Sequence, residues 1–145
     1  MAQSSQEIPA LKDFIATCRE ALAYLGRFGF LEISPPSHRN RNPYQVWFMA
    51  GDRIVVIEGE GWGQCASITL EHTRGLELPE IYLVPTERRP RPTKLKKGVN
   101  RQLQQVRDAA ARLREYGREF LEGDLTRFLQ QAKPLPPYKR PDLNG

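Results

Sequence analysis

Residues 44–72 read YQVWFMAGDRIVVIEGEGWGQCASITLEH, and this stretch decides the fold because it contains the most clearly predicted strands. Gly51 and Asp52 separate two runs rich in β-branched and aromatic residues, and glycine at the first of these positions favours a type II′ hairpin turn. From residue 64 to residue 72 apolar and polar residues alternate, which is typical of a half-buried strand. The sequence therefore predicts an antiparallel meander at the centre of the domain.

The predicted turn assigns each hairpin residue to one face of the sheet. With a two-residue loop, Met49 lies opposite Ile54, and Trp47 lies opposite Val56. One face is then apolar except for a tyrosine hydroxyl, with Tyr44, Val46, Phe48, Val55 and Ile57. The other face is mixed, with Gln45, Trp47, Met49, Ile54, Val56 and Glu58. We expect the first face to be buried under helices and the second to be only partly buried.

Amphipathic helices are predicted on both sides of these strands. Apolar residues recur at spacings of three and four in residues 8–26 and again in residues 99–120. The Gly-Asp pair at 123–124 favours a helix end followed by the cap of a short final helix. Residues 30–33 and 81–84 are predicted as further short strands. The expected fold class is α+β, with an antiparallel four- or five-stranded meander sheet packed by an N-terminal helix and a long C-terminal helix.

The length of 145 residues fits a single domain. We expect this α+β domain to span residues 1–133, with a basic loop at 86–98 inside it, and residues 134–145 to form an extended or disordered tail. The longest runs without charge, 42–51 and 61–70, are half of the roughly 20 residues that a membrane-spanning helix needs. The N-terminus has no secretory pattern. We therefore expect a cytoplasmic protein with no membrane partner.

The chain offers few residues for catalysis or metal binding. His38, His72, Cys18 and Cys65 form neither a zinc pattern nor a disulfide framework, and the glycine-rich loop 59–63 lacks the lysine of a phosphate-binding loop. The sequence predicts no catalytic residue, no metal and no cofactor, and an enzyme would need a histidine to meet Cys65 or a carboxylate in a pocket. Solvated strand ends explain the acidic residues Glu58, Glu60, Glu71, Glu77 and Glu80.

Another protein is the partner that the mixed sheet face suggests. Exposed aromatic and methionine side chains with a polar rim suit the centre of an interface. The candidate partner-binding residues are Trp47, Met49, Ile54, Val56 and Trp62. The stripe in residues 99–120 also has coiled-coil spacing, so a homodimer is an alternative use of that helix. The first hypothesis is a non-catalytic cytoplasmic protein-binding module.

Nucleic acid is the alternative partner, because the positive charge is concentrated in one segment. Residues 87–101 contain seven basic residues and one glutamate, whereas the whole chain has a net charge of +5. The rest of the chain is therefore nearly neutral. The segment has no base-reading motif, so it would serve an accessory protein that grips phosphate groups. The candidate phosphate-binding residues are Arg88, Arg89, Arg91, Lys94, Lys96 and Lys97.

Residues 112–128 read RLREYGREFLEGDLTRF and resemble the C-terminal helix of small uncharacterised bacterial proteins that end a long helix with Phe-Leu-x-Gly-Asp-Leu. The order of elements is similar too, with a leading helix that ends at Gly29-Phe30, a meander of short strands and a closing helix. This layout resembles the immunity-protein type, in which a small α+β domain binds and silences a toxin. The resemblance implies a role in bacterial defence or toxin neutralisation, and it brings no catalytic residue.

Overall fold

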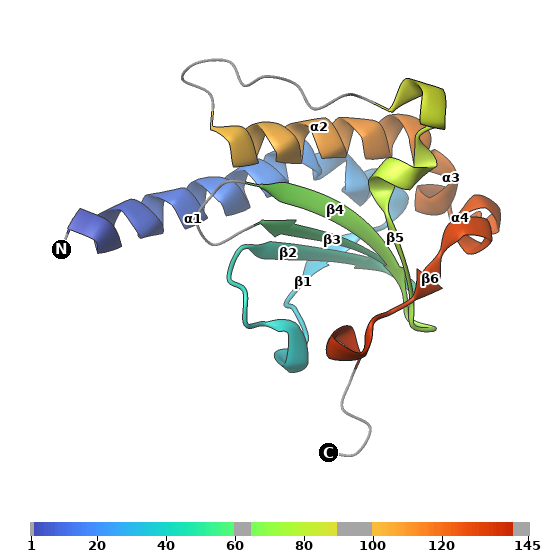
Figure 1. The fold of residues 1–145 in the computed structure, drawn as a ribbon, viewed down its shortest axis with the longest axis horizontal. Coiled ribbons are helices and arrows are strands. Elements are labelled where there is room, and N and C mark those ends of the chain that lie inside the picture. Colours follow the sequence, from blue (N-terminus) through green and yellow to red (C-terminus); the bar gives the residue numbers. More distant parts are fainter. Residues whose placement is uncertain (1, 60–64, 90–99, 141–145) are drawn as a thin grey trace.

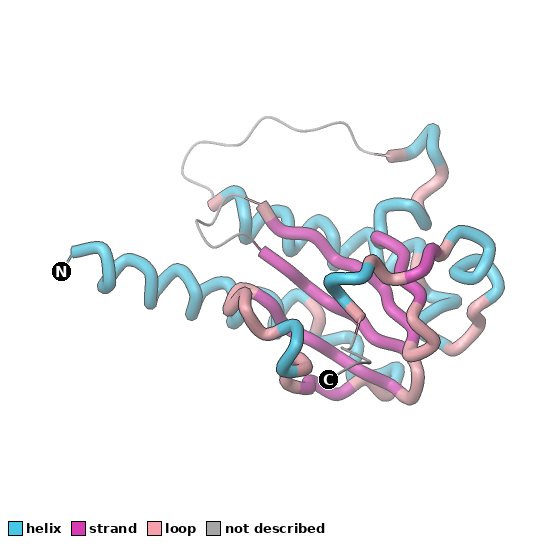
Figure 2. The backbone as a smooth tube through the Cα atoms, turned by 60° about the horizontal axis from the view of Figure 1, so that its bottom comes forward, coloured by secondary structure: helices cyan, strands magenta, loops and turns pink. Residues whose placement is uncertain are grey.

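The computed structural model describes residues 2–59, 65–89 and 100–140, with side chains from residue 11 onward. Its fold is α+β, built on one open antiparallel sheet whose six strands follow one another in chain order. The strands are β1 (Leu31–Ile33), β2 (Gln45–Ala50), β3 (Arg53–Gly59), β4 (Ala66–His72), β5 (Leu76–Pro79) and β6 (Lys133–Pro134). Figures 1 and 2 show the two long helices on one side of this sheet.

The helices come from both ends of the chain. The α-helices are α1 (Ala2–Ala21), α2 (Arg101–Tyr116), α3 (Arg118–Glu122) and α4 (Thr126–Gln131). The 3₁₀ helices are η1 (Ala23–Phe28), η2 (Ser37–Arg39), η3 (Glu80–Leu83), η4 (Thr86–Arg88) and η5 (Pro137–Lys139). The short helices η2 and η5 lie on the sheet face opposite α1 and α2, and they border the candidate site (Figure 2).

The hairpin register predicted from the turn is confirmed. Met49 pairs with Ile54, and Trp47 pairs with Val56. Gly51 has φ of +59°, whereas no described residue other than glycine has a positive φ. A positive φ at the first central residue followed by a negative φ at Asp52 belongs to a type II′ turn rather than type I′. The turn residues thus determine which side chains point to each face.

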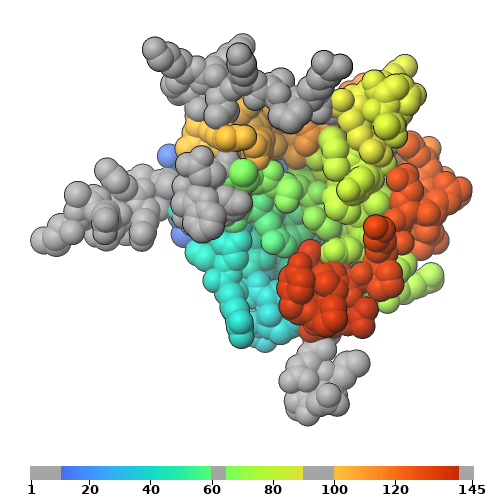
Figure 3. All heavy atoms as spheres, in the orientation of Figure 1, coloured from blue at the N-terminus to red at the C-terminus, as the bar shows by residue number. Residues whose placement is uncertain are grey.

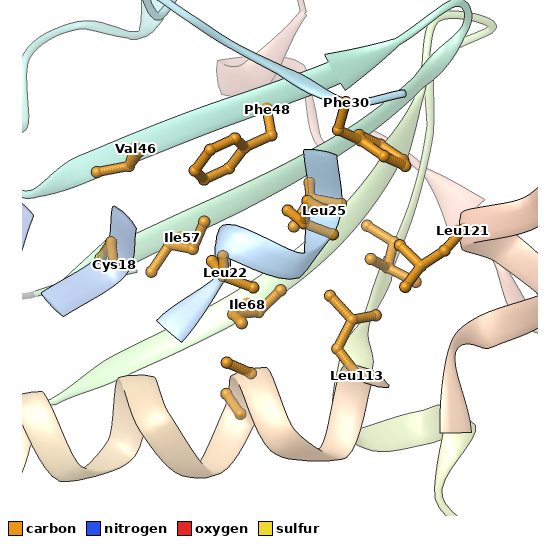
Figure 4. Packing of buried hydrophobic residues seen from close by; sticks show 14 of the residues in the cluster. Cys18, Leu22, Leu25, Phe30, Val46, Phe48, Ile57, Ile68, Leu113 and Leu121 are labelled. Atoms are coloured by element: carbon orange, nitrogen blue, oxygen red, sulfur yellow. The ribbon is translucent and has the colours of Figure 1, made fainter. Parts of the chain in front are cut away.

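The apolar face of the hairpin is buried, as predicted. Phe48, Val55 and Ile57 pack beneath residues of α1 and α2 (Figure 4). The residues from this side of the core include Phe14 and Cys18 of α1, Leu22 between α1 and η1, and Val106, Ala110 and Leu113 of α2. The described part of the apolar stripe of α2 therefore packs into the core of its own domain.

The two predicted helices differ from the observed ones in detail. The first α-helix ends at Ala21 and the chain continues as η1, and the second breaks at Gly117 between α2 and α3. A Cβ atom at Gly117 would lie 2.8 Å from the Leu113 carbonyl oxygen and 3.3 Å from Leu83 Cδ1. Glycine at this position therefore lets the backbone pack closely against Leu113 and Leu83, at the point where α2 ends and α3 begins.

The strand predicted at 81–84 is wrong, because these residues belong mainly to η3. The strand lies earlier, at β5, and it ends at Pro79, which has no N–H to donate to a ladder. Directly after Pro79 the chain turns so that Glu80 is buried and receives hydrogen bonds from Arg112 of α2. In place of the expected strand, the chain forms η3, whose first residue, Glu80, makes a buried ion pair with Arg112.

The segment from residue 133 onward contributes to the sheet. Lys133 pairs with Glu77, Pro134 pairs with Leu76, and Leu135 N–H donates to the Gly75 carbonyl oxygen at 2.8 Å. Part of the segment expected to be an extended or disordered tail therefore forms the sixth strand and the turn after it. Residues 141–145 of that segment lie outside the described residues.

Replacing Gly51 with alanine should lower the free energy of unfolding by about 1–2 kcal/mol, because an L-residue is strained at this positive φ. No atom lies within 4 Å of the added Cβ, so the cost is one of backbone conformation alone. Gly26→Ala is the matched control, since Gly26 also has open space but no positive φ. Urea unfolding measures both variants. Equal losses in the two would contradict the proposed turn.

Candidate functional site

The second face of the sheet is partly covered by Arg39 from η2. Its guanidinium lies 4.5 Å from the centroid of the Trp47 ring and donates to both carboxylate oxygens of Glu71, at 2.7 and 2.8 Å. The Arg39 and Glu71 side chains are 7% and 3% exposed. A bidentate pair of this kind is geometrically specific, so it holds η2 in one position over the sheet.

Gln45 connects the same loop to β2. Its amide oxygen accepts a hydrogen bond from Trp47 Nε1 at 2.8 Å, and its amide nitrogen donates to the carbonyl oxygens of Arg39 and Asn42. Pro35 and Pro36 precede this loop and carry the chain out of β1, because neither can donate to a ladder. The 37–42 loop is therefore held on the sheet in two ways: the Arg39 side chain binds Glu71, and the loop's backbone carbonyl groups accept hydrogen bonds from Gln45.

The C-terminal segment meets this loop from the other side. Lys139 Nζ donates to Glu77 at 2.8 Å, and the Lys139 carbonyl oxygen lies 3.3 Å from His38 Nε2. Figure 3 shows the C-terminal segment in red beside the loop in cyan. The loop around His38 and the segment around Lys139, about 100 residues apart in the sequence, thus lie next to each other on the second face.

A cleft of about 400 Å³ lies between these two segments. Lys139 and Arg39 are paired with carboxylates, whereas Arg41 is exposed and makes no ion pair with any residue in the described ranges. Tyr138 also lines the cleft, and it is 77% exposed. The lining residues are His38, Arg39, Arg41, Asn42, Gln45, Glu58, Tyr138 and Lys139.

Beside the cleft, β1 and β2 leave apolar side chains uncovered on the same face. Leu31 is 73% exposed, and it pairs with Met49, which is half-buried. Ile33, also half-buried, pairs with Trp47 beneath Arg39. We call Leu31, Ile33 and Met49 the apolar ledge. The strand register places the ledge on the same face of the sheet as Trp47 and Gln45, and Gln45 lines the cleft.

The predicted partner-binding residues are only partly accessible. Trp47 is 2% exposed, Val56 is 0% exposed and Ile54 is 9% exposed, and together they form a second apolar cluster. Met49 is half-buried at its margin, and Trp62 lies outside the described residues. The expected exposure of the first three residues is wrong, because Arg39 covers Trp47, and Ile54 and Val56 pack against one another and Trp47 in this cluster.

Of the six predicted phosphate-binding residues, the structure describes two, Arg88 and Arg89. Arg88 is exposed at the end of η4. Arg89 donates to the Val84 carbonyl oxygen at 3.1 Å and lies 5.1 Å from the Tyr82 ring centroid. The other four candidates lie outside the described residues: Arg91, Lys94, Lys96 and Lys97.

Two of the acidic residues that the sequence assigns to solvated strand ends are buried. Glu71 pairs with Arg39, and Glu80 pairs with Arg112, in each case with a partner 32 residues away in the sequence. Burial raises the pKa of Glu80, while the hydrogen bonds from Arg112 oppose this shift. No local signal marks these pairs, since a glutamate at a strand end has the same sequence context whether it is solvated or buried.

The histidines and cysteines are not assembled into a nucleophilic site. Cys65 directly precedes β4 and His72 ends it, which places them about 23 Å apart at the rise of an extended strand. His38 lines the cleft with Glu58, but its recorded hydrogen bond is to the Lys139 backbone. Across the ranges that the structure describes, no group of three or more His, Cys, Asp or Glu side chains could hold a metal ion.

Comparisons with protein-family models, with curated proteins and with solved structures found no match to this chain. None of the helices in the described ranges has the length and apolar character needed to cross a membrane. The fold defines the class of protein as an α+β domain with an open six-stranded antiparallel sheet.

Replacing Arg39 with methionine should destabilise the protein by about 3–5 kcal/mol, because it leaves the Glu71 carboxylate buried without its partner. The double variant Arg39→Met, Glu71→Leu should recover most of this loss, since apolar side chains can replace a buried ion pair at little cost. Arg19→Met is the control, because the Arg19–Glu32 pair is exposed and should contribute little. Chemical unfolding of all three variants tests the effect. A double variant no more stable than the single one would contradict the assignment.

Cys18 should resist thiol reagents in the native protein. Its burial, with a smaller effect of the Glu32 charge, raises the pKa of the thiol to about 12. Because the thiolate is the reactive form, native protein at pH 8 should react quickly at one cysteine, the half-buried Cys65, and at Cys18 only after unfolding. The Cys65→Ser variant should show no fast reaction with Ellman's reagent. Fast labelling of that variant would place Cys18 outside the core.

Proposed function

We propose that this chain is a non-catalytic protein-binding module that acts by occupying a partner protein. Its binding surface is the second face of the sheet, where the apolar ledge adjoins the cleft between η2 and η5. The observation that carries the proposal is that the exposed Leu31 lies on the same sheet face as a cleft lined by the exposed Tyr138 and by Arg41, which makes no ion pair with any residue that the structure describes. Tyrosine and arginine next to an apolar patch are the residues enriched in interface hot spots.

The two segments that border this surface are held in place by contacts within the chain itself. Arg39 is fixed by Glu71, and Lys139 is fixed by Glu77. Gln45 adds hydrogen bonds to the backbone of the 37–42 loop. A surface whose loops are already ordered loses less conformational entropy on binding, which favours affinity.

The resemblance of residues 112–128 to bacterial proteins of the immunity type agrees with this proposal. In this chain the Phe-Leu-x-Gly-Asp-Leu element ends α3 at Gly123, which has φ of +101°, and Asp124 accepts a hydrogen bond from Thr126 N–H at 3.0 Å. The element therefore shapes the fold and leaves the binding surface to other residues. On this proposal the partner is a toxin or another protein of a bacterial defence system, met in the cytoplasm.

A nucleic-acid-binding accessory role is the second candidate. It is favoured by Arg88 and Arg101, which are both exposed at the two points where the basic segment 87–101 joins the described parts of the chain. Binding through this segment would weaken steeply with salt, in proportion to the number of phosphate groups contacted. Binding through the ledge and cleft would depend on salt much less.

Capture experiments with the full chain test the first candidate. Immobilised wild-type protein and a Leu31→Glu, Tyr138→Ala variant are compared for proteins retained from a nuclease-treated host lysate. Loss of both side chains should weaken capture about ten-fold or more, because each would be at the centre of the interface. Leu129→Glu is the control, since Leu129 on α4 is also a large exposed apolar residue.

The pattern across the variants decides the outcome. A protein captured by wild type and by Leu129→Glu, but not by the double variant, would support binding at the second face. A protein captured equally by all three would exclude this surface. A protein captured from an untreated lysate but not from the nuclease-treated one would favour the nucleic-acid candidate.

A further inference from the structure

A separate pocket lies on the helical side of the sheet, where η1 meets α2 and α3. Its volume is about 390 Å³. Every charged residue among the described residues that line it is an arginine, and the other two are aromatic. The lining consists of Tyr24, Arg27, Phe28, Arg114 and Arg118. A pocket with this composition differs from the cleft on the second face, which includes Glu58.

The helix ends bring these residues together. Tyr24 of η1 donates a hydrogen bond from its hydroxyl to the Ala110 carbonyl oxygen of α2 at 2.7 Å. The Arg114 guanidinium, one turn further along α2, lies 5.5 Å from the Tyr24 ring centroid. The helix break at Gly117 then begins α3 with Arg118. The pocket is thus built on helices packed against the core rather than on a loose loop.

The positive charge of this pocket is largely unneutralised. Arg27 and Arg114 make no ion pair and donate no side-chain hydrogen bond within the described ranges. Arg118 donates to Glu122 at 2.6 Å, but both side chains are at least half exposed, so this pair contributes little and can be exchanged. By contrast, Arg39 and Arg112 are committed to buried carboxylates.

The chemistry of the pocket matches a phosphate group. Guanidinium groups present paired N–H donors that fit phosphate oxygens bidentately, and such charge-assisted bonds are stronger than neutral ones. A volume of about 390 Å³ lies in the range of small-ligand sites. We propose that this pocket binds the phosphate group of a small phosphorylated ligand, held by Arg27, Arg114 and Arg118.

The surroundings favour a small ligand over a nucleic-acid strand. A strand needs a continuous positive track along its backbone. The adjoining groove between α1 and α2 shares Tyr24 and Arg114 with the pocket, but it also contains the carboxylates of Glu20 and Glu115. These negative charges would repel a phosphate backbone continuing from the pocket, so the positive region is confined to one site.

Calorimetric titration of the full chain with inorganic pyrophosphate at low salt tests this proposal. Wild-type protein should bind it, and Arg27→Gln and Arg114→Gln should each weaken binding about ten-fold, since each removes a charge-assisted hydrogen bond. Arg74→Gln is the matched control, because Arg74 is an exposed arginine on the β4–β5 turn, away from the pocket. Far-UV circular dichroism verifies that the variants fold, and Arg27 is exposed enough for its variant to be informative alone.

Three results would overturn the proposal. The first is a failure of pyrophosphate to bind wild-type protein at millimolar concentration. The second is an Arg74→Gln variant that weakens binding as much as the pocket variants, which would indicate a general charge effect. Tighter binding of a single-stranded oligonucleotide, lost in the same two variants, would assign the pocket to nucleic acid. The protein-capture result at the second face is separate, because Arg27→Gln and Arg114→Gln leave the ledge and cleft intact.

Discussion

The two-residue turn at Gly51 and Asp52 is the constraint on which both faces of the sheet depend. Because side chains alternate along a strand, a shift of one residue in the β2–β3 register would exchange the two faces. The observed register places Phe48 and Ile57 in the main core and Trp47 and Val56 on the opposite side. The positions of the helices and of the proposed binding surface follow from this assignment.

The two faces are closed by different kinds of interaction. Helices α1 and α2 cover the first face with apolar side chains, which exclude water over a broad area. Only part of the second face is covered, by a buried ion pair between Arg39 and Glu71 and by the hydrogen bonds of Gln45. Directional bonds of this kind position a loop more specifically than apolar contact does, and they leave a polar cleft beside an uncovered apolar ledge.

The two proposed sites differ in how their arginines are paired with the residues that the structure describes. Most buried or half-buried arginines are satisfied within the domain, as Arg39, Arg53 and Arg112 show. The exposed residues Arg27, Arg114 and Arg118 line a pocket that has no carboxylate among its described lining residues. One face of the sheet thus presents a surface suited to a protein, and the helical side presents a pocket suited to a small anion.

The sequence by itself determined the features that depend on local pattern: the hairpin and its register, the apolar face, the two amphipathic regions and the helix end at Gly123. These follow from neighbouring residues, because side-chain periodicity and glycine conformations act over a few positions. Only the tertiary structure decided that Arg39 covers Trp47, that Glu80 turns inward to Arg112, and that residues 133–134 form a strand. Each of these contacts joins segments distant in the sequence, and a charged residue in a turn has the same local context whether it faces water or folds back onto a buried carboxylate.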